Sequence, residues 1–478
     1  MGLKKNIVYS AVLQGANYIF QFITFPYASR VLGPEGIGLY NYSTSIVQYF
    51  MLFAAMGILN LGTREIAKCT SQQQINQTFS KLLVTNILIS LGVLVIYIPL
   101  IFLIPQFYEI KTYLFIGIFQ IIFNAITIEW LFRGIQNFKF ITLRAVIIRI
   151  IYVILVFVLI NNHNDVMTYY LLSVLTLVAN GIINWKYAKR ATQFIKVNII
   201  DSLNQYLKPM FLLGSQALIS FFYVGFNTVY LGFICNEAQV GYFSTATKII
   251  IIILALYTAY STAMMPKLSS LVASGNKEQE SYLIYSSIEL LCCFSFPLII
   301  ILLFYSDIII YLIAGSQYNE SIPILTIGAP LILILGLNQI LFVQVLLPRG
   351  HDKAIAKICL YGASVGILLN IILVGYLNLQ SLGSIITWFT AESIVIAVAI
   401  LYLRKIINPI YFIKKLLHYG SIYLPLGILV LFVNIFITSR WFSLACAIVA
   451  IIIYSHIAMI YLIKQNQYLS LIHKFKHI

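Results

Sequence analysis

The feature that most constrains this chain is a series of long apolar runs separated by short polar connectors. Each run is about 20 residues long, the length of α-helix that crosses a hydrocarbon core roughly 30 Å thick. Hydrophobic residues make up 61% of the 478 residues and charged residues only 9%, whereas soluble domains carry about 25% charged residues. A soluble fold is therefore excluded, and the sequence predicts an all-α polytopic membrane protein.

The apolar runs predict about fourteen crossings. The first six lie at 7–29, 39–61, 82–104, 112–131, 143–160 and 166–185. The others lie at 209–232, 241–263, 283–305, 322–346, 358–378, 382–402, 421–437 and 441–462. The predicted domains are an N-lobe at 1–190, a linker at 191–208, a C-lobe at 209–403, and a basic interfacial segment with two extra helices and a tail at 404–478.

Lys and Arg are distributed unequally over the predicted connectors. With the N-terminus inside, 25 of the 30 Lys and Arg fall on the cytoplasmic side and three on the other side. Cytoplasmic loops carry such an excess, so we expect both termini in the cytoplasm. The net charge of +16 favours anionic phospholipids or an anionic substrate as partners. Nucleic acid is not expected, because the basic residues form no patch interleaved with aromatic residues.

Two short matches indicate an internal repeat. A shift of 203 residues aligns 37–42 with 240–245, and a shift of 216 residues aligns Arg133-Gly134 with Arg349-Gly350. Both matches relate equivalent loops of two six-helix halves. Because six is an even number, the halves share one orientation in the membrane. The sequence therefore predicts two pseudo-symmetric lobes around a cavity, with two extra C-terminal helices.

Polar residues recur at helical spacing within several predicted spans. The amides on these faces are Gln14, Asn17 and Gln21 in the first span, Asn41 and Gln48 in the second, and Gln216 and Asn227 in the seventh. Residues three, four or seven positions apart share one helix face. One interpretation is that these faces line a hydrated cavity that accepts sugar. The alternative is that the amides hydrogen-bond across helix contacts.

Charged residues within spans are more informative, because each costs at least about 2.5 kcal/mol at a helix centre. Arg149 and Lys248 are candidates to meet an anion, and snorkelling to the interface is the alternative. Glu392 is the deepest carboxylate. Burial favours its protonated form, so it is a candidate for proton coupling, with a neutral structural carboxyl as the alternative.

Glu129 and Arg133 are four residues apart, which predicts an ion pair on one helix face. Arg64 belongs to a charged cluster at the inner end of the second span, where a solvated helix end is the alternative interpretation. The cysteines and histidines show no metal-ligand spacing, and the chain has no phosphate-binding loop. No metal, no cofactor and no ATP-driven pump are expected.

Several motifs resemble those of Wzx-type polysaccharide flippases, members of the multidrug, oligosaccharidyl-lipid and polysaccharide (MOP) exporter superfamily. The matching motifs are FPY at 25–27, SRVLGPEGIG at 29–38, YNY at 40–42, REIAK at 64–68, EW at 129–130 and RG at 133–134. The resemblance implies a MATE-like fold and a transporter rather than an enzyme. Such proteins move undecaprenyl-pyrophosphate-linked oligosaccharide from the inner to the outer leaflet of the bacterial plasma membrane by alternating access.

The resemblance also implies roles for particular residues. Arg30, Arg64, Arg149 and Lys248 would attract the pyrophosphate headgroup, and Glu129 with Arg133 would form a gate. A polymerase and glycosyltransferases of the same pathway are further candidate partners. Two alternatives stay open: a MATE-like drug or metabolite exporter, and a membrane-embedded glycan polymerase or ligase. The second is disfavoured because the outer connectors are short and carry isolated acidic residues.

Overall fold

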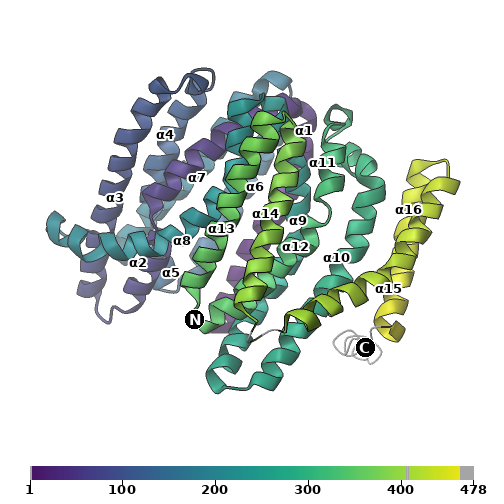
Figure 1. The fold of residues 1–478 in the computed structure, drawn as a ribbon. Coiled ribbons are helices and arrows are strands. Elements are labelled where there is room, and N and C mark those ends of the chain that lie inside the picture. Colours follow the sequence, from purple (N-terminus) through teal and green to yellow (C-terminus); the bar gives the residue numbers. More distant parts are fainter. Residues whose placement is uncertain (1–2, 405, 407, 463–478) are drawn as a thin grey trace. The chain divides into compact units, whose positions relative to one another are not determined.

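The computed structural model is helical over nearly all of its described length, and the described residues contain no β-strand (Figure 1). The structure describes residues 3–404, 406 and 408–462; within these ranges, the side chains at 3–8, 10–12, 14, 17–18, 215–224, 411 and 461–462 lie outside the description. The predicted all-α polytopic class is confirmed. The chain forms two compact units, Met1–Ser244 and Thr245–Ile478.

Twelve described segments are long and apolar enough to cross a membrane. Two features relate this number to the fourteen crossings expected from the sequence. Helix α1 (Leu3–Ala55) is 53 residues long and breaks at Gly33, where φ is 70°, so it holds the first two expected crossings. Helix α8 (Ile199–Ile234) contains the seventh, but many of its side chains lie outside the description.

The unit Met1–Ser244 is a bundle of long helices with two short ones inserted. After α1 it contains α2 (Ile58–Ala67), α3 (Gln72–Leu103), α4 (Lys111–Ile126), α5 (Glu129–Gly134), α6 (Phe138–Leu159), α7 (Val166–Ala191) and α8. Short 3₁₀ turns at Pro105–Phe107 and His163–Asp165 join neighbouring helices. In Figure 1, α3, α4 and α7 lie side by side, and α8 crosses the ends of the bundle near α2.

The two short helices α2 and α5 each follow a left-handed backbone position. Met56 and Gly57 have φ values of 36° and 75° before α2, and Ile128 has a φ of 39° before α5. The two helices then pack tightly, because Gly62 of α2 lies against the ring of Trp130 of α5. A Cβ atom at position 62 would be only 2.7 Å from that ring. The core here also includes Tyr206 and Met210 of α8.

The predicted linker belongs to the first unit. Residues 192–198 are extended, and α8 begins at Ile199, ten residues before the predicted span at 209–232. Asn198 caps the helix by accepting hydrogen bonds from the backbone N–H groups of Ile200 and Asp201. The lobe boundary at 208/209, which rests on the basic connector between the sixth and seventh predicted crossings, stays a prediction.

The unit Thr245–Ile478 contains most of α9 (Glu237–Ser274) and all later helices. These are α10 (Lys277–Ile313), α11 (Ser321–Gly328), α12 (Leu331–Asn338), α13 (Asp352–Asn370), α14 (Gln380–Tyr402), α15 (Pro409–Phe436) and α16 (Arg440–Ile457). Shorter elements are 3₁₀ turns at Ser316–Tyr318 and Leu347–Arg349, and π-helical segments at Gln339–Leu346, Ile371–Tyr376 and Ala458–Leu462.

The last two helices pack on α10 through a small core of their own. Tyr305 of α10 is fully buried, and its Oη lies 2.8 Å from Oγ of Ser443 on α16. Tyr423 and Leu426 of α15 belong to the same core. An ion pair between Arg440 and Asp307 lies at one end of the contact.

Candidate functional site

Glu129 is the centre of a partly buried charged network in the first unit. Its Oε1 accepts hydrogen bonds from Nε of Arg133 at 3.0 Å and from Nη2 at 2.7 Å. Its Oε2 lies 3.3 Å from Nη2 of Arg144 on α6. The predicted ion pair between Glu129 and Arg133 is confirmed, and Arg144 is an additional member that the sequence analysis did not single out.

Arg144 is the buried member of this network. The residue is 6% exposed, and its Nη1 donates to Oδ1 of Asn184 on α7. Asn184 in turn donates to the carbonyl oxygen of Thr127. A sequence signal did exist, because Arg144 occurs on the same face of α6 as the buried residues Ile141 and Ile148. Because Arg144 is only the second residue of the predicted span at 143–160, the charge count assigns it to the adjoining cytoplasmic loop.

The backbone before Glu129 is strained. Ile128 has a φ of 39°, a region that β-branched residues rarely adopt. The bond from Asn184 to the carbonyl of Thr127 holds the chain at the residue just before this break. Helix α5 can then start at Glu129, which directs the carboxylate toward α6. The three charged residues therefore depend on one irregular turn between α4 and α5.

Arg149 lies farther along α6, well inside the helix. Helices α1 and α6 run in the same direction, because Thr142 Oγ1 donates to the carbonyl of Tyr9 at 3.0 Å and Tyr27 Oη donates to the carbonyl of Ile160 at 2.7 Å. The two contacts are 18 residues apart on each helix, from Tyr9 to Tyr27 on α1 and from Thr142 to Ile160 at the end of α6. Arg149, seven residues past Thr142, is therefore level with residue 16 of α1, about 10 Å along the helix axis from Thr142.

One donor of the Arg149 guanidinium is notable for its surroundings. Its Nη1 is buried and has no hydrogen-bond partner among the residues that the structure describes. A buried N–H without a partner costs about 1–3 kcal/mol, and a guanidinium matches the oxygens of a phosphate or carboxylate. This side chain is equipped to take an anion at the level of the polar face of α1.

The other candidates in the first unit differ in their surroundings. Arg30 and Gln21 are exposed, Gln48 is half-buried, and Asn227 is buried. Asn41 donates to the carbonyl of Ile37 one turn earlier, which favours its structural interpretation. The side chains of Gln14, Asn17 and Gln216 lie outside the described residues. Arg64 is exposed and lies 3.1 Å from Glu65, which also binds Lys68 at 2.9 Å.

Glu392 of α14 is buried in the second unit and is 4% exposed. Nε1 of Trp388 donates to its Oε1 at 3.2 Å, and Nδ2 of Asn338, at the end of α12, donates to its Oε2. Oδ1 of the same Asn338 is buried without a hydrogen-bond partner among the described residues. Lys248 of α9 is half-buried in the same unit. The carboxyl group of Glu392 is therefore buried in the second unit with two polar partners, Trp388 and Asn338.

The repeated Arg-Gly turn also carries an ion pair in the second unit. Arg349 pairs with Glu280 of α10, and their side chains are 13% and 8% exposed. Arg349 also donates to the carbonyl of Val345 at 2.7 Å. The sequence analysis identified the two Arg-Gly pairs but not Glu280, which lies 69 residues away along the chain. Within the described residues, no group of His, Cys, Asp or Glu forms a candidate metal site.

Comparison with known proteins gives consistent matches. The profile of the family described as "Polysaccharide biosynthesis protein" matches residues 3–272. A "Putative O-antigen transporter" of Escherichia coli (strain K12) is 26% identical over 409 residues, covering 85% of this chain and 97% of the relative. A protein of the same name from Shigella dysenteriae is 29% identical over 388 residues, covering 78% and 93%.

Solved structures share the fold. "Lipid II flippase MurJ, inward closed conformation" matches with a TM-score of 0.76 at 15% identity, covering 96% of this chain and all of that one. An inward-facing multidrug resistance MATE family transporter of the MOP superfamily matches with a TM-score of 0.61 at 13% identity, covering 87% and 99%. The predicted MATE-like fold class is confirmed.

Proposed function

The chain belongs to the polysaccharide biosynthesis protein family, and from this premise we propose that it is a flippase for undecaprenyl-pyrophosphate-linked oligosaccharide. In this proposal it moves the repeat unit from the inner to the outer leaflet of a bacterial plasma membrane by alternating access. Both termini lie in the cytoplasm, which the excess of Lys and Arg on that side supports. The protein performs no chemical step on the sugar.

The single observation that carries the proposal is the buried Nη1 of Arg149, which has no hydrogen-bond partner among the described residues. A pyrophosphate linker is the most strongly charged part of the cargo, and a guanidinium inside a helix bundle offers it charge-assisted hydrogen bonds. Arg149 is level with the polar face of α1. We assign Arg149 to the headgroup, with Arg30, Arg64 and Lys248 as further attraction sites. Gln14, Asn17, Gln21, Asn41, Gln48, Gln216 and Asn227 are the proposed sugar contacts.

The network around Glu129 is proposed as a gate. Glu129 accepts hydrogen bonds from a partly exposed partner, Arg133, and faces a buried one, Arg144. The phosphate of the cargo would compete with the Glu129 carboxylate for the guanidinium groups. Arg133 can leave the pair more easily than Arg144, because the Arg133 side chain is partly exposed and that of Arg144 is buried. The strained turn at Ile128 then gives α5 a second backbone conformation to adopt.

Two sources of driving force fit the charges. Moving about two negative charges outward across an inside-negative potential releases roughly 4.6 kcal/mol per 100 mV. Voltage alone therefore favours export. Glu392 is the proposed site for an additional coupled proton, because it is buried among polar partners in the second unit.

A MATE-like drug or metabolite exporter is the second candidate function, since MATE transporters share the fold. The two functions predict different phenotypes. Deletion of a flippase accumulates lipid-linked oligosaccharide on the inner leaflet and removes the surface glycan. Deletion of a drug exporter changes drug tolerance and leaves the glycan intact.

The proposal is tested by complementing such a deletion with variants of Arg149. We expect Arg149→Gln to lose most surface glycan and Arg149→Lys to retain part of it, because a lysine keeps the charge but not the paired donors. The matched control is Lys139→Gln, which neutralises an exposed residue at the start of the same helix. Full complementation by Arg149→Gln at wild-type protein level would remove Arg149 from the headgroup site.

A further inference from the structure

The segment that joins α7 to α8 is fastened to α3. Thr192 Oγ1 and the backbone N–H of Gln193 lie 2.9 and 3.0 Å from Oδ1 of Asn76. The N–H of Ile195 donates to Oγ of Ser80 at 2.9 Å. Gln72 donates to the carbonyl of Ala191 at 2.8 Å. We call residues 192–198 the strap; it holds the start of α8 in a fixed position on the bundle.

The first half of α8 has one face packed on that bundle. Ser202, Tyr206 and Met210 recur every four residues and are buried. The two residues Tyr206 and Met210 belong to the core formed by α2, α3 and α5. Gln205, next to this face, accepts a hydrogen bond from Nζ of Lys81 on α3 at 2.9 Å. This half of the helix therefore lies against the rest of its unit.

Two different flanks remain exposed on either side of that face. Ile200, Leu207 and Phe211 are 67%, 45% and 55% exposed and lie within about 40° of one another around the helix. The other flank carries four polar residues, Asp201, Asn204, Gln205 and Lys208, and one exposed apolar residue near the transmembrane end, Leu212. An exposed apolar flank beside a polar one is the pattern of a helix at a membrane–water interface.

The length of α8 agrees with an interfacial position for its first half. Its 36 residues extend about 54 Å at 1.5 Å per residue, whereas the hydrocarbon core is roughly 30 Å thick. The predicted crossing begins at residue 209, after this half. Since residues 209–232 are already long enough to cross the hydrocarbon core, residues 199–208 lie outside it.

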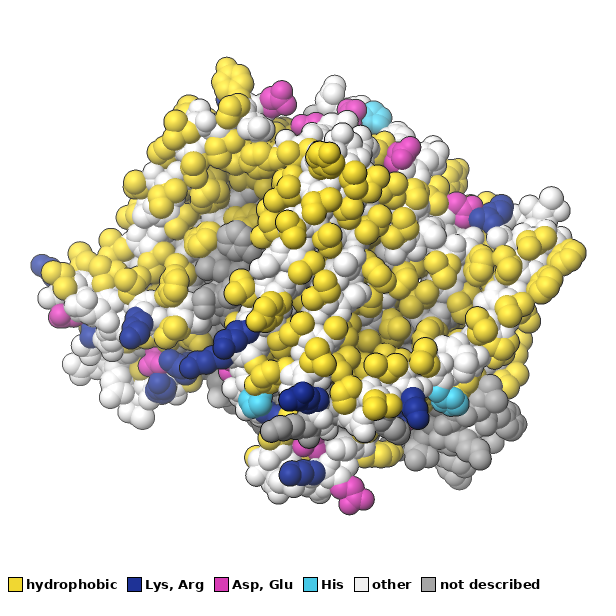
Figure 2. All heavy atoms as spheres, in the orientation of Figure 1, with side chains coloured by type: hydrophobic (Ala, Val, Ile, Leu, Met, Phe, Trp, Pro, Cys, Tyr) yellow, Lys and Arg dark blue, Asp and Glu magenta, His cyan; other side chains and the backbone are white. Residues whose placement is uncertain are grey.

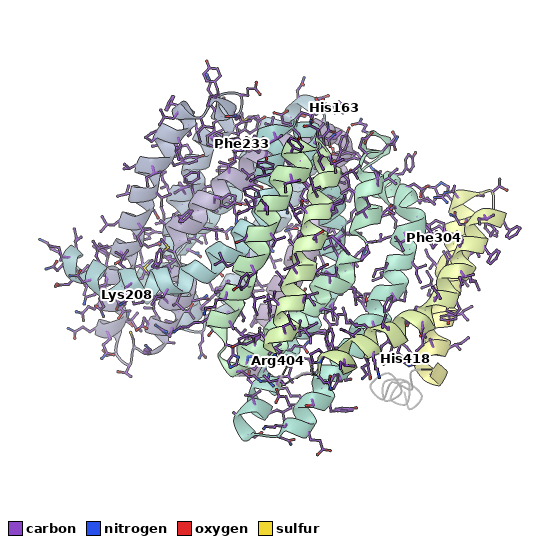
Figure 3. All side chains as sticks on the ribbon, in the orientation of Figure 1. His163, Lys208, Phe233, Phe304, Arg404 and His418 are labelled. Atoms are coloured by element: carbon purple, nitrogen blue, oxygen red, sulfur yellow. The ribbon has the colours of Figure 1, made fainter. Side chains whose placement is uncertain are left out.

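The strap and its neighbours also concentrate positive charge. Between residues 186 and 208 there is a single acid, Asp201, and five exposed basic residues: Lys186, Lys189, Arg190, Lys196 and Lys208. No ion pair is found for these five within the described residues, and Arg190 lies over the ring of Tyr187. Figure 2 shows Lys and Arg side chains gathered at the level of α8, and Figure 3 labels Lys208 on that helix.

We propose that the last turns of α7, the strap and the first half of α8 form a binding surface for the anionic phospholipids of the cytoplasmic leaflet. Ile200, Leu207 and Phe211 insert at the boundary of the acyl chains, and the five basic residues contact the phosphate groups. The surface rests on the proposed cytoplasmic orientation. It is independent of the cargo, so it stands or fails separately from the flippase activity.

The depth of the helix is measured on the full chain in nanodiscs, with the native cysteines replaced by alanine and one reporter cysteine added. Leu207→Cys tests the apolar flank and Asn204→Cys the polar flank. We expect a fluorophore at 207 to be quenched several-fold more by brominated lipid than one at 204, and the reverse with a water-soluble quencher. Equal accessibility of both positions to the aqueous quencher would overturn the insertion.

The lipid preference is measured with the same reporter at 207. Nanodiscs contain phosphatidylcholine alone or an equal mixture with phosphatidylglycerol. Quenching by brominated lipid should rise with phosphatidylglycerol, and this rise should be lost when Lys186, Lys189, Arg190, Lys196 and Lys208 are all changed to Gln. The control changes five exposed basic residues of the second unit to Gln: Lys267, Lys277, Lys353, Lys357 and Arg404.

The control variant should keep the full response to phosphatidylglycerol. An unchanged response in the strap variant, or a response equally lost in the control, would overturn the specific role of the five residues. Flipping of lipid-linked oligosaccharide is recorded in the same nanodisc preparations after transfer to liposomes. A preparation that inserts α8 but does not flip would contradict the proposed function and leave the lipid surface intact.

Discussion

Gly38 of α1 and Gly241 of α9 lie against each other without room for a side chain on either. A Cβ at Gly38 would be 1.7 Å from the carbonyl oxygen of Glu237, and one at Gly241 would be 1.9 Å from that of Pro34. The shift of 203 residues that aligns the two halves relates Pro34 to Glu237 and Gly38 to Gly241. The contact is thus reciprocal, as a two-fold relation between repeats produces. This spatial contact supports the repeat independently of the sequence match.

Alanine at Gly38 or Gly241 is therefore expected to destabilise the protein. Each added methyl group collides with backbone rather than with a flexible side chain, and such overpacking costs about 1–3 kcal/mol. The thermal midpoint of the purified protein should fall for both variants. Gly92→Ala is the matched control, because a Cβ there has nothing within 4 Å; helix propensity should make it neutral or slightly stabilising. Equal midpoints for all three would contradict the close contact.

Arg144 should matter more for stability than Arg133, although both bind Glu129. The side chain of Arg144 is 4% exposed and that of Arg133 is 36% exposed. Removing one partner of a buried pair costs about 3–5 kcal/mol, whereas exposed pairs contribute about 0–1 kcal/mol. Arg144→Gln should lower the thermal midpoint well below that of Arg133→Gln.

The link through Asn184 adds a second expectation. Asn184→Ala removes the group that joins Arg144 to the carbonyl before the strained turn. The double variant with Arg144→Gln should be less destabilised than the sum of the two single variants, because each breaks the same connection. Strict additivity in this double-mutant cycle would mean that the two residues act independently.

Glu392→Gln should preserve the fold and change the pH response. The amide oxygen still accepts from Trp388, and the NH₂ group donates to the Asn338 oxygen once the Asn338 amide turns over to present that oxygen. If Glu392 carries the coupled proton, flipping by Glu392→Gln in liposomes should no longer depend on pH. A wild-type pH profile would exclude this role and leave a structural carboxyl.

The docking of the last two helices gives a local stability prediction. Tyr305 Oη and Ser443 Oγ are buried and 2.8 Å apart. Tyr305→Phe should cost about 1 kcal/mol, because the buried Ser443 hydroxyl on α16 loses one of its two partners and keeps only the carbonyl of Val433. The fluorescence of Trp441, at the start of α16, offers a probe of this docking during thermal unfolding. No shift in that transition would mean that the hydroxyl pair contributes nothing.

The features that the sequence predicted correctly follow from composition and local spacing. Spanning length and hydropathy predicted the helical membrane fold, and the four-residue spacing of Glu129 and Arg133 predicted their ion pair. Arg144 escaped because its pairing depends on the turn at Ile128. That residue adopts a left-handed conformation without any glycine or proline to signal it. The packing of α5 against α2 and α6 makes the turn favourable.

Other differences have equally local causes. The polar, basic segment before residue 209 indicates a connector in the sequence, which places the seventh span at 209, whereas the cap at Asn198 starts the helix earlier. Asn41 was grouped with a polar face, but its amide bonds to its own helix. An amide in a membrane helix satisfies itself locally as readily as it faces a cavity, and periodicity does not separate the two.

The account is tested most directly by flipping of purified lipid-linked oligosaccharide in proteoliposomes, scored by how fast the sugar becomes accessible to an enzyme outside. Wild-type protein and Lys139→Gln should flip at equal rates, faster under a potential that favours outward movement of negative charge. Arg149→Gln should be slower by an order of magnitude or more at an unchanged thermal midpoint. No flipping of this lipid by active wild-type protein, or full activity in Arg149→Gln, would contradict the account.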